Sequence, residues 1–512
     1  MNGTLGSEKS SAQVSSHVRN LTLVATILGS GIIFLDGTVV NVALPAIDRQ
    51  LNAGLSGLQW VVDSYVLTLA ALLIPGGSLG DRYGRRKIMV IGLAGFGVLS
   101  AFCGLSTSIP WLISGRLLQG VAGALLVPGS LAILQATFPK GEARGRAIGQ
   151  WSGWSGISAV IGPLAGGWIV DRFSWHWIFF INIPIILIAI FLMMRYVPES
   201  KNLQASKELD WSGVATITLG LGGLAYGLIE GPVAGWGSPL VLTGLIIGLG
   251  ALLLFPLMEN KTQSPMVPLR LFKSQDFSAA NLTTLGVYFG LSGTTFFLVI
   301  YLQNVMGYSA LNAGLVLAPI SLFMLVLSPI FGRLAGRYGP RLFMTMGPIV
   351  CSLGLLGFLR VGPRSNYWTH LLPSIVIFGL GLATTVAPLT NTVISSVPAR
   401  HSGVAAAFNN TISRVANLLA VASLGVIVTL SFSNAVVRQT QGLSLNSSEK
   451  KLINQATADP TGAMKTSKLA PEVSNALQQA YTQAFHLAML VTAASVFAGG
   501  VIAGGFIRNH ET

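Results

Sequence analysis

Charged residues are scarce in this sequence. Asp, Glu, Lys and Arg together make up only 9% of the 512 residues, whereas soluble domains carry about 25%. Hydrophobic residues account for 52% of the chain, and the mean hydropathy is +0.67. This composition excludes an ordinary soluble domain and predicts an all-α polytopic protein embedded in a lipid bilayer.

Cysteine and nucleotide-binding motifs are also nearly absent. The two cysteines, Cys103 and Cys351, lie inside apolar runs, which indicates neither a disulfide framework nor a metal site. The sequence has no GxxxxGK phosphate loop, no His/Cys cluster and no cytoplasmic pair of acids suited to Mg²⁺. We therefore expect no cofactor and no use of ATP, which leaves an ion gradient as the energy source. The same absences argue against a membrane enzyme of lipid or prenyl chemistry.

Acidic residues are outnumbered by basic ones, 17 to 31, which gives a net charge of +14. A basic balance can indicate a nucleic-acid partner, but here the bases are spread over short loops between apolar runs. With the N-terminus inside, the inner segments hold twenty Lys and Arg residues and the short outer loops hold four. We therefore predict no nucleic-acid partner, and cytoplasmic N and C termini on a protein of the cell membrane.

The apolar runs number fourteen, each long enough to cross a bilayer core. The first, Leu21–Leu44, is too long for the apolar region of a signal peptide, so we interpret it as a retained helix. An even number of spans places both termini on one side. The predicted spans are 20–44, 58–79, 88–106, 110–134, 145–169, 176–197, 211–230, 239–258, 279–302, 311–334, 342–361, 368–392, 402–430 and 480–507.

The sequence contains an internal repeat. Gly332–Met344 repeats Gly77–Met89 at an offset of 255 residues, with Gly336 in place of Asp81. Such a parallel repeat predicts two related six-helix halves, with the seventh and eighth spans inserted between them (6+2+6). The predicted parts are a disordered N-terminus (1–18), an N-terminal six-helix bundle (19–197), a linker with the inserted hairpin (198–278), a C-terminal six-helix bundle (279–507) and a cytoplasmic tail (508–512).

The C-terminal bundle is predicted to include one long outer loop, residues 431–479. The loop is rich in Ser, Asn, Gln, Lys and Thr. Within it, Val473–Tyr481 has a helical pattern. The loop is either a cover over the outer mouth or a flexible connector.

Ionisable residues inside the apolar runs are rare and therefore informative. Asp36 and Asp63 lie within the first and second spans, Arg116 within the fourth, and Glu230 at the outer end of the seventh. A charge at mid-membrane costs roughly 2.5–3.5 kcal/mol, so these residues are functional candidates. The helical rise places Asp36, Asp63 and Arg116 about 12, 8 and 9 Å below the outer surface, which predicts a salt-bridge cluster facing a cavity. The alternatives are that Asp63 caps its helix, that Arg116 snorkels and that Glu230 faces the membrane interface.

The loop Gly76–Lys87 carries one acid, four bases and regularly spaced glycines, which is more than a topological anchor needs. The pattern resembles the loop 2–3 signature of the major facilitator superfamily. That resemblance implies two six-helix halves that rock about a central cavity, and a gating loop in which Asp81 would latch the inner gate of the outward-open state. The matching gating-loop residues are Gly77, Asp81, Arg82, Gly84, Arg85 and Arg86.

Other stretches resemble the fourteen-span drug:proton antiporters of that superfamily. In Leu35–Pro45, Asp36 matches the acid implicated there in proton coupling and cation recognition, while Arg116 matches an arginine assigned to proton relay. The fifth span matches the signature of proton-driven exporters, and its glycines and proline predict close helix packing and a kink. The matching residues of this antiporter helix are Gly153, Gly162, Pro163, Gly166 and Gly167. The last six spans contain no acid, which argues against a broad dicationic spectrum.

Aromatic rings near the buried acids suit a lipophilic cation, although packing or contact with lipid explains any one of them equally well. The cavity candidates are Phe34, Trp60, Tyr65, Trp151, Trp154, Tyr288 and Tyr301, together with Gln119. The resemblance implies a monomeric, proton-coupled multidrug efflux antiporter for lipophilic, cationic or amphipathic small molecules. The alternatives are a dedicated exporter of one metabolite, antibiotic or lipid, and a non-transporting sensor or scaffold.

Overall fold

The computed structural model describes residues 15–139, 141–202, 209–262, 265–398, 401–441, 449–450, 453, 457, 459–462 and 470–509. This part of the chain is all-helical and contains fourteen helical segments long and apolar enough to span a membrane, as predicted. The helices are α2 (Ser16–Leu51), α3 (Gly54–Tyr83), α4 (Arg85–Gly104), α5 (Ile109–Gly123), α6 (Leu126–Thr137), α7 (Glu142–Arg172), α8 (Trp177–Phe180), α9 (Asn182–Tyr196), α10 (Trp211–Ala234), α11 (Pro239–Lys261), α12 (Gln275–Asn304), α13 (Ala310–Tyr338), α14 (Pro340–Gly357), α15 (Leu372–Ser395), α16 (Ser402–Thr440) and α18 (Pro471–Phe506). Short turns of helix are η1 (Leu269–Lys273), η2 (Phe358–Arg360) and η3 (Tyr367–Leu371).

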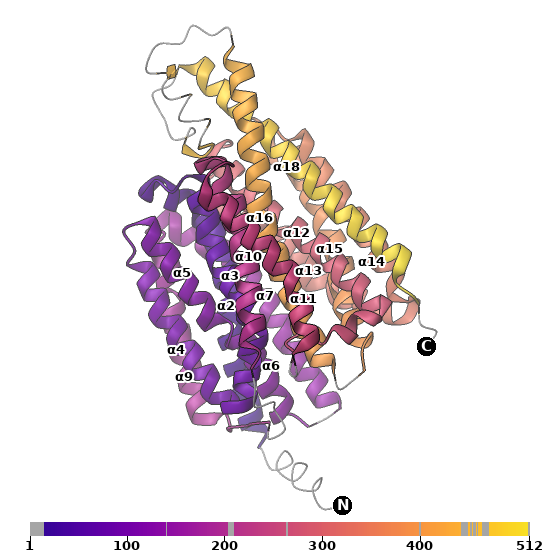
Figure 1. Ribbon diagram of the computed structural model, residues 1–512. Coiled ribbons are helices and arrows are strands. Elements are labelled where there is room, and N and C mark those ends of the chain that lie inside the picture. The colour runs from indigo at the N-terminus through magenta and orange to yellow at the C-terminus, as the bar shows by residue number, and fades with distance from the viewer. Residues whose placement is uncertain are drawn as a thin grey trace, which may run out of the picture.

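The helices form two groups and a hairpin (Figure 1). The N-terminal group contains α2–α9, the C-terminal group contains α12–α18, and the inserted hairpin is α10 with α11. The two groups meet along a seam where α7 packs against α13 and α3 packs against α16. Helix α10 packs against both α3 and α16, so the hairpin lies over one side of this seam.

The repeated motif has the same local structure in both groups. Gly84 lies between α3 and α4 with φ +119°, and Gly339 lies between α13 and α14 with φ +86°. Residues other than glycine rarely adopt a backbone conformation with positive φ. The two glycines therefore end one helix and begin the next at corresponding places, which explains why this part of the repeat is strict.

Two predicted segment boundaries are wrong. The outer loop predicted at 431–479 is shorter, because α16 continues to Thr440 and α18 begins at Pro471. The extension of α16 packs against α18, as in the contact between the rings of Phe432 and Tyr481, 5.9 Å apart, and Val473, in the extension of α18, is buried. The predicted helical stretch Val473–Tyr481 is confirmed as part of α18.

The N-terminal segment predicted to be disordered is also shorter than 1–18, because α2 begins at Ser16, where the Ser15 hydroxyl accepts a hydrogen bond from the Val18 amide. Predictions for residues 1–14, for 203–208 of the linker, for much of the outer loop and for 510–512 of the tail lie outside the described residues.

Candidate functional site

An ion pair lies in the interior of the N-terminal group. Nη1 of Arg116, on α5, donates to Oδ2 of Asp36, on α2, at 2.6 Å. The exposed fractions of the two residues are 1% and 0%. Arg116 also donates from Nε to the Val61 carbonyl at 3.2 Å, and the ring centroid of Tyr65 lies 4.1 Å from its guanidinium carbon. Both charges are thus shielded from water and from lipid.

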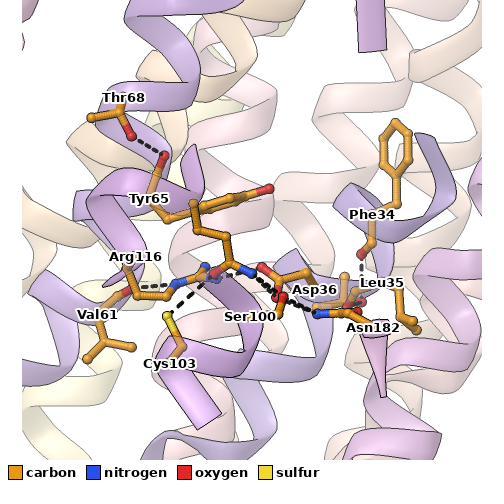
Figure 2. Close-up of polar contacts among 12 residues, drawn as sticks. Phe34, Leu35, Asp36, Val61, Tyr65, Thr68, Ser100, Cys103, Arg116 and Asn182 are labelled. Atoms are coloured by element: carbon orange, nitrogen blue, oxygen red, sulfur yellow. Dashed lines mark hydrogen bonds and ion pairs between the residues drawn. The ribbon is translucent and has the colours of Figure 1, made fainter. Parts of the chain in front are cut away.

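Amide and hydroxyl groups complete the network around this pair (Figure 2). The Asp36 Oδ1 atom accepts from Asn182 Nδ2 at 3.2 Å and from Gln119 Nε2 at 3.4 Å. Gln119 Oε1 accepts from Arg116 at 2.7 Å, and Gln119 Nε2 donates to Ser100 Oγ at 2.9 Å. Helices α2, α3, α4, α5 and α9 therefore contribute to one buried polar cluster. A buried ion pair is tolerated when its remaining hydrogen-bonding groups are satisfied in this way.

The predicted cluster of Asp36, Asp63 and Arg116 is correct for only two of its members. Asp63 has no exposed surface, and neither of its carboxylate oxygens has a hydrogen-bond partner among the residues that the structure describes. It cannot join the pair because Val61 and Tyr65, two positions away on α3, contact Arg116, and two residues correspond to about 200° around a helix. The predicted cavity-facing position of the cluster is also wrong in this conformation, because the surrounding helices enclose it.

Glu230 has a different place from the other predicted acids. Its Oε1 atom accepts a hydrogen bond from Trp60 Nε1 at 2.7 Å, and the ring of Tyr226 lies 6.2 Å from that of Trp60. Glu230 and Tyr226 are on α10, whereas Trp60 is on α3. In this arrangement Glu230 attaches the inserted hairpin to the N-terminal group through Trp60, the chain neighbour of Val61.

The predicted cavity residues divide into buried and exposed ones. Tyr65 and Gln119 are buried in the ion-pair network, and Trp151 is 8% exposed and donates to Ser30 Oγ at 2.7 Å. In this conformation packing within the N-terminal group encloses these three side chains, and their place in a cavity stays a prediction. Trp154 is 51% exposed. The ring of Phe34 lies 5.9 Å from the guanidinium carbon of Arg414, which comes from the C-terminal group.

Two further predicted cavity residues belong to the C-terminal group. Tyr301 is fully buried and its hydroxyl forms a hydrogen bond with Thr482 Oγ1 at 3.1 Å, so its place in a cavity stays a prediction. Tyr288 lies on α12 and is half-buried, and its place in a cavity stays a prediction.

The gating loop is held within the N-terminal group. Asp81 pairs with Arg85 at 2.7 Å, and Arg85 Nη1 donates to the Ala132 carbonyl at 3.2 Å. The Glu199 carboxylate, which the sequence analysis did not single out, accepts from the backbone amides of Arg86 at 3.0 Å and Lys87 at 3.1 Å. The side chain of Arg82 lies against its neighbour Tyr83, 5.0 Å from the ring centroid. A Cβ at Gly77 would come within 3.1 Å of Pro128, and one at Gly84 would meet Glu199.

The antiporter helix, α7, joins the ion-pair region to the seam. A Cβ at Gly162 would meet the Thr38 side chain, and one at Gly166 would lie 3.0 Å from Val42, both on α2. On the other side, a Cβ at Gly167 would lie 2.6 Å from backbone atoms of Ala310 and Leu311, on α13. Pro163 is accommodated inside α7, and its carbonyl lies against Gly314. At Gly153 the predicted close packing is not found, since no atom of another described segment lies within 4 Å of a Cβ there.

Hydrogen bonds across the seam lie toward the helix ends that are predicted to face the outside of the cell. Gln59 Nε2 donates to the Val421 carbonyl at 2.6 Å, and Gln303 Nε2 donates to the Val42 carbonyl at 2.9 Å. The Asp171 carboxylate accepts from the amides of Ala310 at 3.0 Å and Leu311 at 2.9 Å. These residues were not predicted from the sequence, and neither were Ser100 and Asn182. The signal that could have found them is a polar side chain within an apolar run or just beyond its end.

Comparisons with known proteins agree with this architecture. The Major Facilitator Superfamily model matches residues 26–421. The "Tetracenomycin C resistance and export protein" of Streptomyces glaucescens is 36% identical over 407 residues, which cover 80% of this chain and 75% of that protein. The "Multidrug resistance protein Stp" of Mycobacterium tuberculosis is 36% identical over 408 residues, with the same coverage.

Among solved structures, a bacterial homolog of the human lysosomal transporter Spinster, in an inward-facing and unoccupied conformation, aligns with a TM-score of 0.67. It is 18% identical, and the alignment covers 95% of this chain and 98% of that one. At this identity the similarity shows a shared fold.

Proposed function

The chain belongs to the Major Facilitator Superfamily, and we propose that it is a proton-coupled exporter of drug-like small molecules. It is a multi-pass membrane transporter and not an enzyme. The single observation that carries the proposal is the enclosed Asp36–Arg116 ion pair, with its oxygen and nitrogen atoms 2.6 Å apart. Breaking such a pair by removing one charge costs about 3–5 kcal/mol. A proton that neutralises Asp36 therefore changes the relative energies of the conformations of this group.

The proton effect needs a route to the seam, and α7 supplies it. Thr38, two residues after Asp36 on α2, lies against Gly162, while Gly167 meets α13 across the seam. We propose that protonation of Asp36 frees Arg116 and allows α2 and α7 to move together relative to α13. The N-terminal and C-terminal groups would then rock between a state open to the cytoplasm and a state open to the outside.

The order of events follows from charge. In the outward-open state, a proton on Asp36 displaces the substrate, and in the inward-open state, loss of that proton restores the site that binds substrate. Substrate affinity on the inner side should therefore rise with pH. The orientation that this cycle requires, with both termini cytoplasmic, is that predicted from the distribution of Lys and Arg.

Asp63 is proposed as a second proton site. An ionised carboxylate with no partner and no exposure costs several kcal/mol, so we propose that Asp63 carries a proton in this conformation and loses it when the seam opens. The neighbouring residue on the same face, Gln59, is bonded across the seam to Val421, so opening the seam exposes Asp63 as well.

Replacing Asp63 by Asn tests this assignment. Asn has the shape of the protonated acid, so the stability of the purified protein should change by less than about 1 kcal/mol. Gradient-driven transport should fall about tenfold, equivalent to about 1.4 kcal/mol in the barrier. Thermal unfolding and vesicle flux measure the two effects. Unchanged transport would remove Asp63 from the proton pathway.

Asp81→Asn tests the gating loop. The Asp81–Arg85 pair is partly exposed and contributes little to stability, so folding should be unaffected. We expect turnover to fall about fivefold, or about 1 kcal/mol in the barrier, while the dissociation constant for substrate stays the same, because the loop acts on the conformational step. Loss of substrate binding with an unaltered conformational exchange rate would contradict a latch role.

The substrate range is proposed from the relatives. One relative is described as a multidrug protein and the other as an exporter of one antibiotic. We propose a multidrug exporter of lipophilic, cationic or amphipathic compounds, with Phe34 and Trp154 as aromatic contacts. The dedicated exporter is the second candidate, and Arg414 beside Phe34 favours it for compounds that carry an acidic group.

Flux in reconstituted vesicles separates these possibilities. A pH gradient imposed across vesicles that contain the purified protein should drive ethidium and tetraphenylphosphonium against their concentration gradients, and an uncoupler should abolish the flux. Transport that ignores the gradient would contradict the proposal. In a competition panel of cationic dyes, neutral polycyclic compounds and aromatic acids, competition by several classes indicates a multidrug exporter, and competition by one class indicates a dedicated exporter.

A further inference from the structure

A cavity of about 330 Å³ lies between the inserted hairpin and the seam. Its volume falls within the range of small-ligand sites, about 300–1,000 Å³. Helices α3, α10, α11 and α16 and the segment that leads into α12 supply its walls, with Ala71, Leu221, Phe255 and Val415 among the lining residues. Nearly every lining side chain is apolar, which suits a hydrocarbon chain.

One wall of the cavity carries positive charge on its other side. The wall includes η1, whose 3₁₀ geometry places residues three apart on the same face. Leu269 and Phe272 line the cavity, while Arg270 and Lys273 share a different face and are exposed. Lys261, at the end of α11, is exposed as well. Among the described residues, no carboxylate lies within 4.0 Å of these three bases.

The wall is fixed in place by a buried acid. Glu259, 2% exposed, accepts a hydrogen bond from the amide of Val267 at 3.3 Å, and Val267 lines the cavity. This bond joins the last turn of α11 to Val267, which precedes η1. Val267 is therefore held in the cavity wall by a hydrogen bond to α11 in this conformation.

We propose that the cavity binds one acyl chain of an anionic phospholipid, whose phosphate is held by Lys261, Arg270 and Lys273. The lining of the cavity is apolar and suits an acyl chain. The basic residues are in the segment predicted to lie at the inner membrane surface, where anionic lipids attract Lys and Arg. The positive charge of these three bases disfavours a lipophilic cation as the occupant. Because α3 and α16 belong to different groups, the lipid would fill the space between the hairpin and both sides of the seam.

Native mass spectrometry of the purified full-length protein, incubated with equal amounts of phosphatidylglycerol and phosphatidylcholine of the same chain length, tests this site. The wild type should retain mainly phosphatidylglycerol. The double variant Arg270→Gln/Lys273→Gln should retain about 25-fold less, about fivefold for each base removed. The control Arg195→Gln/Lys201→Gln, which removes two exposed bases elsewhere, should behave as the wild type.

A second variant tests the chain-binding part. Ala71→Phe places a ring in the cavity and should reduce retention of phosphatidylglycerol even though all three bases remain. Equal retention of the two lipids by the wild type, or unchanged phosphatidylglycerol retention by the Arg270/Lys273 double variant, would overturn the headgroup site. Unchanged retention by Ala71→Phe would overturn the chain site. The measurement uses neither a gradient nor a transported compound, so its result is independent of the proposed transport activity.

Discussion

Asp36→Asn should reduce gradient-driven export by at least about 100-fold, equivalent to about 2.7 kcal/mol in the barrier, because the amide cannot take up and release the proton. The substitution also leaves the Arg116 charge buried without its counter-charge. A change of this kind costs about 3–5 kcal/mol of stability, so the thermal unfolding temperature of the purified protein should fall. Vesicle flux and thermal unfolding measure the two losses separately.

The double variant Asp36→Asn/Arg116→Gln is the matched control. It removes both charges, and replacing a buried ion pair by neutral residues is often neutral or stabilising. We therefore expect the double variant to recover most of the stability lost in Asp36→Asn but none of the transport. If export returned together with stability, Asp36 would have a structural role and the proposed coupling would be wrong.

Gly167→Val should be the second severe change. The new side chain would meet backbone atoms of Ala310 and Leu311, only 2.6 Å from the position of its Cβ. Backbone cannot move aside as a flexible side chain does, so the cost should reach about 3 kcal/mol and lower the population of the closed seam about 100-fold. Transport should fall, because the protein is confined to states in which α7 and α13 are apart.

Gly153→Val is the control for this prediction, because it makes the same substitution in the same helix. No atom of another segment in the described part of the chain lies within 4 Å of a Cβ at Gly153, so the control measures the general effect of Val in α7. Disulfide cross-linking of Cys introduced at Gln59 and Val421, which meet across the seam, reports closure. Equal cross-linking in the two variants would show that the contact at Gly167 does not control the seam.

The fold was largely predictable from the sequence because the membrane imposes a strict length on each span. The fourteen apolar runs predicted the number of membrane spans among the described residues, and the repeat around Gly84 and Gly339 marked two places where the chain must turn sharply. The ends of α16 and α18 were not predictable from hydropathy, because those turns of helix lie beyond the apolar run and are held by packing such as the contact between Phe432 and Tyr481.

The site was predictable only in part. Asp36 and Arg116 were found because a charge in an apolar run is costly, and their separation in sequence, 80 residues, does not hinder their contact. The exclusion of Asp63 depends on which face of α3 meets α5, and this is a property of packing. Ser100 and Asn182 carry no charge, so neither the cost of burial nor the spacing in sequence distinguishes them from other polar residues.

Proton release on substrate binding tests the central claim most directly, since the claim is that one carboxylate responds to both the proton and the transported compound. Purified protein in weakly buffered detergent solution, with a pH-indicator dye, should release protons when a transported compound is added. Asp36→Asn/Arg116→Gln, the charge-free double variant, should release none from this site. Release from the double variant equal to that of the wild type would contradict the account.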